Sequence, residues 1–167
     1  MKTTISISTL AITLSSFMPL SGTGVVPSYD KVGREALEAF RHGSISEYQQ
    51  LFPKLKDFYE LMDADAAIYG TTLEAAKRDF ARVYLEQIYP ALSMSFEQIV
   101  KEGKARGIDW SAAKFDRVEC SSVPSGKFGH SSLNIIFTTN GASHTITIEK
   151  ALIINGEWKV SQFAKLI

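Results

Sequence analysis

The sequence predicts an α+β fold in which N-terminal helices pack on a strongly bent C-terminal antiparallel meander of about four strands. Amphipathic helical segments fill residues 28–106, and short strand-like segments follow from residue 114 to 160. Two Asn-Gly pairs, Asn140-Gly141 and Asn155-Gly156, lie between these strand-like segments. Asn-Gly favours the type I′ turn of a two-residue hairpin, because both central residues need positive φ.

The N-terminal residues 1–24 are predicted to be a secretory signal peptide, followed by a single α+β domain at 25–167. Lys2 supplies a short basic start, residues 5–20 carry no charge, and Gly24 ends a run of small residues suited to cleavage. A transmembrane anchor is the alternative, but the apolar run is short and contains many Ser and Thr residues. We therefore expect an exported protein, periplasmic or extracellular in a bacterium, with no stable membrane anchor.

Composition narrows the class of partner. The chain has 18 Lys and Arg against 18 Asp and Glu, and loss of Lys2 with the signal leaves 17 basic side chains. Such a nearly neutral chain argues against nucleic acid as a partner. Its single cysteine, Cys120, permits no internal disulfide. A lipoprotein anchor would need a cysteine directly after the N-terminal apolar run, and Cys120 lies far from it.

Helical periodicity predicts five helical segments. The first spans 28–42 with Ser28 as its N-cap, the second begins at Ser44, and the third begins at Pro53. The longest runs from residue 71 to 88, where Pro90 is expected to break or kink it before a further helix that ends near residue 107. The expected core combines helix and sheet positions: Phe80, Val83, Tyr84, Phe96, Ile99, Leu133, Ile135, Ile146 and Ile148.

The two Asn-Gly turns also predict the strand register. The first turn pairs Phe137 with His144 and Ile135 with Ile146, on one largely apolar face. The second turn pairs Ile153 with Trp158, and strict alternation would place this pair on the opposite face. Either a β-bulge near residues 149–150 restores these residues to the core face, or the sheet curls so that both faces are buried in part.

Helices followed by a bent meander resemble the nuclear-transport-factor-2-like superfamily, also called cystatin-like or SnoaL-like. Residues 101–111 and the segment Gly156-Glu157-Trp158-Lys159-Val160 are similar to those of small exported bacterial members. The resemblance implies a cone-shaped fold that encloses a cavity. Members include isomerases, polyketide cyclases and dehydratases as well as non-catalytic binding or dimerisation modules, so the fold alone does not give the function.

The sequence offers few residues for chemistry. His144 lies among apolar positions on the predicted inner face, where an imidazole could act as acid or base, and Asp79 is a carboxylate of suitable type. The residues expected to line a ligand pocket are Tyr84, Phe96, Phe137 and His144. No cofactor motif is present, and the three histidines lack metal-ligand spacing.

These observations favour a non-catalytic binding or interaction domain with a small aromatic-lined cavity for an apolar or carbohydrate-like ligand. The alternative is an acid–base enzyme of isomerase, cyclase or dehydratase type that uses His144 or a helix carboxylate. The Ser- and Thr-rich outer face of the sheet, residues 134–147, would be the contact surface of a homodimer.

The signal-peptide assignment gives a first prediction. Protein purified from its native host is expected to lack residues up to about Gly24, because the uncharged run after Lys2 is the substrate pattern of signal peptidases. Intact-mass spectrometry measures this directly. A mass that corresponds to a chain beginning at Met1 would contradict the prediction.

Overall fold

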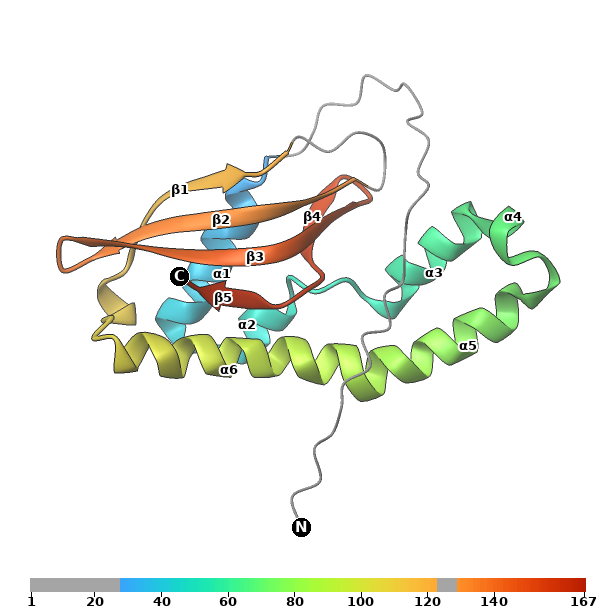
Figure 1. The fold of residues 1–167 in the computed structure, drawn as a ribbon, viewed down its shortest axis with the longest axis horizontal. Coiled ribbons are helices and arrows are strands. Elements are labelled where there is room, and N and C mark those ends of the chain that lie inside the picture. Colours follow the sequence, from blue (N-terminus) through green and yellow to red (C-terminus); the bar gives the residue numbers. More distant parts are fainter. Residues whose placement is uncertain (1–27, 123–128) are drawn as a thin grey trace, which may run out of the picture.

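The computed structural model describes residues 28–122 and 129–167, and Figure 1 shows helices followed by a curled antiparallel sheet. The predicted α+β class is therefore confirmed. The predicted signal peptide, residues 1–24, and the loop expected at 124–126 lie outside the described residues.

The helices begin and end close to the predicted positions. Gly43, with φ of 63°, ends the first helix, and the Ser44 hydroxyl accepts a hydrogen bond from the Glu47 N–H at 3.3 Å to cap the second. The prediction of Ser28 as the N-cap of the first helix was wrong by one residue: the N-cap is Tyr29, and the Ser28 hydroxyl accepts from the Asp30 N–H at 3.3 Å. The helical elements are α1 (Asp30–His42), α2 (Ile45–Gln49), α3 (Leu55–Ala64), α4 (Ala66–Tyr69), η1 (Gly70–Thr72), α5 (Leu73–Val83), η2 (Tyr84–Ile88), α6 (Tyr89–Ala105) and η3 (Trp110–Ala112).

Pro90 does not break the helix that precedes it, in contrast to one of the two outcomes considered from the sequence. Helix α5 continues into α6 through η2, a single π-helical segment in which the Tyr89 N–H donates to the Tyr84 carbonyl five residues earlier. Proline lacks an N–H and clashes with the carbonyl four residues before it, and a wider turn relieves both problems. The long helix is therefore continuous, with an irregular turn just before Pro90.

The sheet has the register that the two turns predict. Its strands are β1 (Lys114–Cys120), β2 (His130–Thr139), β3 (Ala142–Ile154), β4 (Glu157–Val160) and β5 (Ala164–Leu166). Strands β1 to β4 pair in sequence order, and β5 pairs with β3 beside β4. Phe137 lies opposite His144 and Ile153 opposite Trp158, as predicted, while β5 was not anticipated. Asn140 and Asn155 both have positive φ, as type I′ turns require.

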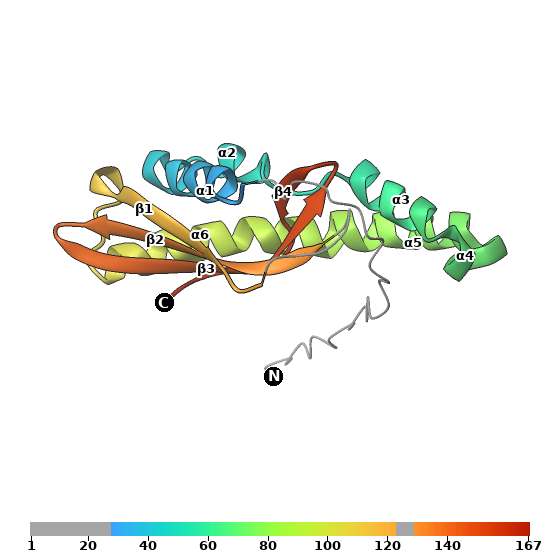
Figure 2. The same ribbon diagram turned by 90° about the horizontal axis from the view of Figure 1, so that it is seen from above.

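A β-bulge at residues 149–150 explains the change of face along β3. Leu133 pairs with Ile148, and the next paired residues are Ser131 and Ala151, so Glu149 and Lys150 together lie opposite Ser132. The extra residue places Ala151 on the same buried face as Ile148. Both explanations considered from the sequence hold: the structure contains the bulge, and Leu152 and Ile154 are buried as well as Ala151 and Ile153 in the strongly bent sheet (Figure 2).

Helices α1 and α6 pack on the concave side of the sheet, with α2 next to them (Figures 1 and 2). The core between them includes Phe40, Phe96, Ile99, Ile135 and Ile146, all buried. Gly103 of α6 allows close approach of the Trp110 indole, whose Nε1–H donates to the Val100 carbonyl at 3.3 Å. No helix in the described ranges is long and apolar enough to cross a bilayer.

Helices α3, α4 and α5, residues 55–83, extend beyond the sheet (Figures 1 and 2); we call these residues the helical arm. The predictions that Phe80 and Val83 belong to the main core were wrong, because both lie in this arm and are only half-buried. Phe80 packs instead on Phe58, with ring centroids 4.8 Å apart. The helical stripe was identified correctly, but it faces another helix rather than the sheet.

The contact between Gly103 and Trp110 gives the second prediction. A glycine-to-alanine change inside a helix normally stabilises a protein by about 0.5 to 1 kcal/mol. In Gly103→Ala, however, the new Cβ would overlap Trp110 Cζ2, well inside van der Waals contact. We expect Gly103→Ala to lower the free energy of unfolding by about 1 to 3 kcal/mol, measured by urea denaturation.

Lys104→Ala is the control, because Lys104 is an exposed residue of the same helix. It should change the free energy of unfolding by less than about 0.5 kcal/mol. A stabilised Gly103→Ala variant would show that the indole does not pack against this helix.

Candidate functional site

A continuous row of aromatic rings runs from the sheet to the helical arm, and it contains all four residues predicted to line a pocket. Neighbouring ring centroids lie between 4.8 and 6.2 Å apart. Such separations are those of packed aromatic pairs. The row runs through His144, Phe137, Trp110, Phe40, Phe96, Tyr48, Phe52, Tyr89, Tyr84, Phe80 and Phe58.

The four predicted pocket residues take different places in this row. Phe96 and Phe137 are buried in the core, where Phe96 stacks on Phe40 and Phe137 stacks on Trp110. Tyr84 is buried at the base of the helical arm, and His144 is half-buried next to Phe137. Phe96, Phe137 and His144 therefore pack on neighbouring rings between the helices and the sheet, whereas Tyr84 packs on Phe80 and Tyr89 at the base of the arm.

The two residues considered for acid–base chemistry lie on different elements. His144 is on β3 near the Asn140–Gly141 turn, and among the described residues it makes a ring contact with Phe137 but no hydrogen bond or ion pair with a carboxylate. Asp79 is exposed on α5, and its Oδ1 lies 3.7 Å from Arg82 Nη2. The structure does not bring this histidine and this carboxylate together.

Two buried tyrosine hydroxyls in the row differ in their hydrogen bonding. The Tyr84 hydroxyl donates to the Pro53 carbonyl at 2.6 Å, and burial, with smaller contributions from Tyr89 and Asp57, raises the pKa of Tyr84 to about 12. The Tyr48 hydroxyl has no partner of good hydrogen-bond geometry among the described residues. Burial raises the pKa of Tyr48 well above its usual range, and the side chain of Ser95 partly offsets this effect.

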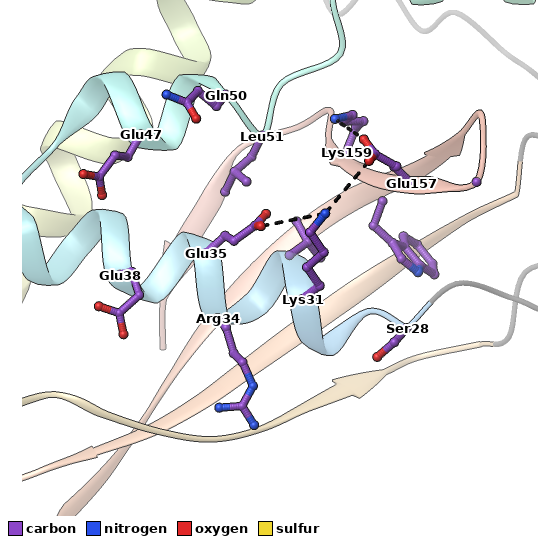
Figure 3. Close-up of a pocket in the computed structure, with 13 residues that line it drawn as sticks. Ser28, Lys31, Arg34, Glu35, Glu38, Glu47, Gln50, Leu51, Glu157 and Lys159 are labelled. Atoms are coloured by element: carbon purple, nitrogen blue, oxygen red, sulfur yellow. Dashed lines mark hydrogen bonds and ion pairs between the residues drawn. The ribbon is translucent and has the colours of Figure 1, made fainter.

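A surface groove of about 590 Å³ lies between α1, α2 and the turn that joins β3 to β4 (Figure 3). Helix α1 contributes Lys31 and Glu35 to one wall, and strand β4, after the turn, contributes Glu157 and Lys159 to the other. Its apolar lining consists of three buried residues, Val32, Leu51 and Trp158. The Val160 N–H donates to the Leu51 carbonyl at 2.8 Å, which fixes strand β4 to the end of α2.

One ion pair joins the two walls of the groove, and others lie within each wall. Lys31 Nζ lies 4.0 Å from Glu35 Oε1 and 3.9 Å from Glu157 Oε1, and Lys159 Nζ lies 2.9 Å from Glu157 Oε2 (Figure 3). The hydrogen bond from Lys159, followed by the positive charges of Lys159 and Lys31, lowers the pKa of Glu157. A carboxyl with a lowered pKa stays ionised near neutral pH, so Glu157 is suited to hold a cationic or hydroxylated group and not to donate a proton.

A smaller hollow of about 290 Å³ lies next to the π-helical turn. Tyr84 and Tyr89 form one side of it, and Gln49, Phe52 and Pro53 lie on the other. It includes one of the four residues predicted to line a ligand pocket. Within the described ranges, no three His, Cys, Asp or Glu side chains are grouped as a metal site would require.

Sequence reasoning missed the groove because its residues are far apart in the chain. Lys31 and Glu157 belong to the first helix and the last hairpin, and each is a common surface residue. The only sequence signal was the Gly-x-Trp segment after Asn155, which placed Trp158 near a turn. Helix packing on the sheet, which no local pattern encodes, brings the two walls together.

Comparison with known proteins identifies no relative. No protein-family model matches the chain, and neither a curated protein nor a solved structure matches it significantly.

The two tyrosine hydroxyls give the third prediction. Tyr48→Phe removes a buried hydroxyl without a well-formed hydrogen bond, so the free energy of unfolding should stay the same or rise by up to about 1 kcal/mol. Tyr84→Phe removes a 2.6 Å hydrogen bond and leaves the buried Pro53 carbonyl without that donor. The free energy of unfolding should therefore fall by about 1 to 2 kcal/mol. Urea denaturation of both variants measures the difference.

Each variant serves as the control for the other, because both remove one phenolic oxygen from a buried ring. A loss of more than about 1 kcal/mol in Tyr48→Phe would show that its hydroxyl is well bonded in solution.

Proposed function

We propose that this chain is an exported, non-catalytic binding or interaction domain that uses its surface groove. The ligand is a carbohydrate-like molecule or a short segment of another protein, since the groove combines paired charges with a buried apolar lining. The uncharged N-terminal run supports export to the periplasm or beyond. The resemblance to the nuclear-transport-factor-2-like superfamily, which includes non-catalytic modules, supports the same class.

The observation that carries the proposal is the packing of the aromatic row. A small-molecule enzyme of the cone-shaped type needs an interior cavity with titratable groups directed into it. Here the rings of Phe40, Phe96, Trp110 and Phe137 contact one another between α1, α6 and the sheet. The larger hollow lies outside this interior, at the surface between α1 and the β3–β4 turn.

The electrostatics of the groove also favour binding over catalysis. Acid–base catalysis generally needs two titratable groups whose pKa values are pushed apart and close to neutral pH. In the groove, the pKa of Glu157 is lowered and so moves away from neutral pH. Lys31 forms ion pairs with Glu35 and Glu157 in its two walls. Such a surface can exchange these salt bridges for polar contacts with a ligand.

The alternative, an acid–base enzyme, has less support. It would use His144, whose ring packs on Phe137, or a helix carboxylate such as the exposed Asp79. A ligand or product whose retention depends on His144 and not on the groove would favour this alternative.

Native mass spectrometry of protein purified from its own host tests the proposal and is the fourth prediction. We expect a retained non-covalent ligand on the wild-type protein. We expect its loss from Glu35→Trp, because Glu35 is an exposed residue of the groove wall and an indole there would occupy the groove.

Glu97→Trp is the matched control, since Glu97 is also an exposed helical glutamate but lies on α6 and does not line the groove. It should retain the ligand. Absence of any ligand from the wild type, or equal retention by both variants, would contradict a binding role for the groove. Loss of the ligand in His144→Ala alone would favour the enzyme.

A further inference from the structure

We propose that the helical arm is a docking surface for a second copy of this chain, with two arms packed antiparallel around a two-fold axis. The arm residues lie apart from the groove lining. The inference therefore goes beyond the proposed ligand-binding function and can fail without it.

The arm is amphipathic but incompletely covered. None of the eleven residues of α5, all of them described, is buried, although Leu73, Phe80 and Val83 form an apolar stripe. Phe58 of α3 packs on Phe80 and is also only half-buried. Two packed helices bury the apolar residues between them but leave the edges of their apolar faces exposed to solvent. In a helix bundle, a third or fourth helix covers these edges.

Two large apolar side chains are exposed at opposite ends of the arm. Ile68, in α4, is 73% exposed, and Leu85, in η2 directly after the arm, is 60% exposed. In an antiparallel two-fold pair, the tip of each arm meets the base of the other. The Ile68–Leu85 contact then forms twice, because each residue pair in a two-fold interface occurs in both directions.

Some charges on the two sides of the arm remain available to a partner, although Asp57 is buried, Glu60 accepts from the Asn155 amide, Asp63 pairs with Lys77 and Arg82 pairs with Asp79. Helices α3 and α4 with their junction, residues 55–69, carry four carboxylates against one lysine, and α5 carries three basic residues against two carboxylates. Arg78 of α5 and Asp65 at the α3–α4 junction have no ion-pair partner among the residues that the structure describes. Antiparallel packing of α5 on the acidic side of a second arm brings opposite charges together.

The same charges make a membrane surface a poorer partner. Helices that bind anionic lipid surfaces carry an excess of Lys and Arg on their polar face. The arm as a whole is slightly acidic, because six carboxylates at 55–83 oppose four basic side chains. A second copy offers an apolar edge of the same kind, and its Asp65 can pair with Arg78 of the first copy.

Sedimentation-velocity ultracentrifugation of the full chain over a wide concentration range tests the proposal and is the fifth prediction. We expect a concentration-dependent monomer–dimer equilibrium. Ile68→Glu and Leu85→Glu should each raise the dimer dissociation constant at least tenfold, because each places two charges in the two-fold interface. Both positions are exposed in the protomer, so the variants should fold.

Ile167→Glu is the matched control, since Ile167 is 68% exposed and follows the last strand of the sheet. It should leave the dissociation constant unchanged. Arg78→Glu should weaken the dimer, and Asp65→Lys in the same chain should restore it to within about threefold, a rescue that a merely structural role would not give.

Three results would overturn the proposal. The first is a monomer at every concentration. The second is a dimer that resists both arm variants but dissociates in Thr145→Arg, which would place the contact on the outer face of the sheet. The third is flotation of the wild type, but not of Ile68→Glu, with anionic phospholipid vesicles, which would make the arm a lipid-binding element.

Discussion

The β-bulge at Glu149 and Lys150 is the constraint on which the rest of the structure depends. A strand with strict alternation would present Ile146 and Ile148 to the helices and Ala151 and Ile153 to the opposite side. The extra residue opposite Ser132 places both pairs on the buried face and bends the strand between them. The Lys150 carbonyl accepts hydrogen bonds from the Ser161 and Gln162 N–H groups. These two residues lie between β4 and β5, so the edge that pairs with β3 is interrupted opposite the bulge.

This bend determines where the groove lies. It turns the β3–β4 hairpin toward α1 and α2, and the hydrogen bond from the Val160 N–H to the Leu51 carbonyl holds it there. Trp158 and Leu51 then form an apolar lining, and Glu157 comes within 3.9 Å of Lys31. A flat sheet would direct this hairpin away from the helices, and the residues of the groove would be separate surface side chains.

The parts of the fold that could be predicted from the sequence are those set by local chemistry. Asn-Gly turns fix strand register because only a few turn geometries join two strands with two residues, and the pairing of Phe137 with His144 followed directly. Helix ends at Gly43 and Ser44 also follow from local capping. The sequence shows that strict alternation fails between Ile148 and Ala151. It does not show whether a bulge or a curl of the sheet is responsible, so the bulge was one of two explanations.

The errors have a common physical origin, which is that helical periodicity shows that a face is apolar but not what covers it. Phe80 and Val83 have the spacing of core residues, yet they lie on a helix that passes beyond the sheet. Pro90 is a local breaking signal, yet a π-helical turn accommodates it, and tertiary contacts hold Tyr84 before it and Phe96 after it. Strand β5 is only three residues long and has no turn signal, so its pairing with β3 arises from the end of the chain returning along an open edge.

The same limit applies to the predicted pocket residues, because Phe96, Phe137 and His144 pack on neighbouring rings whereas Tyr84 also borders the smaller hollow. Tyr84, Phe96, Phe137 and His144 were chosen as aromatic residues on inward faces, and they do lie in one continuous row of rings. An inward aromatic side chain can either border a cavity or fill it, and the choice depends on the volume that neighbouring elements supply. Here Phe40 and Trp110, from two other elements, occupy the space between Phe96 and Phe137. Packed rings therefore fill the interior between α1, α6 and the sheet, and the groove lies at the surface, where the bend brings the β3–β4 hairpin toward α1.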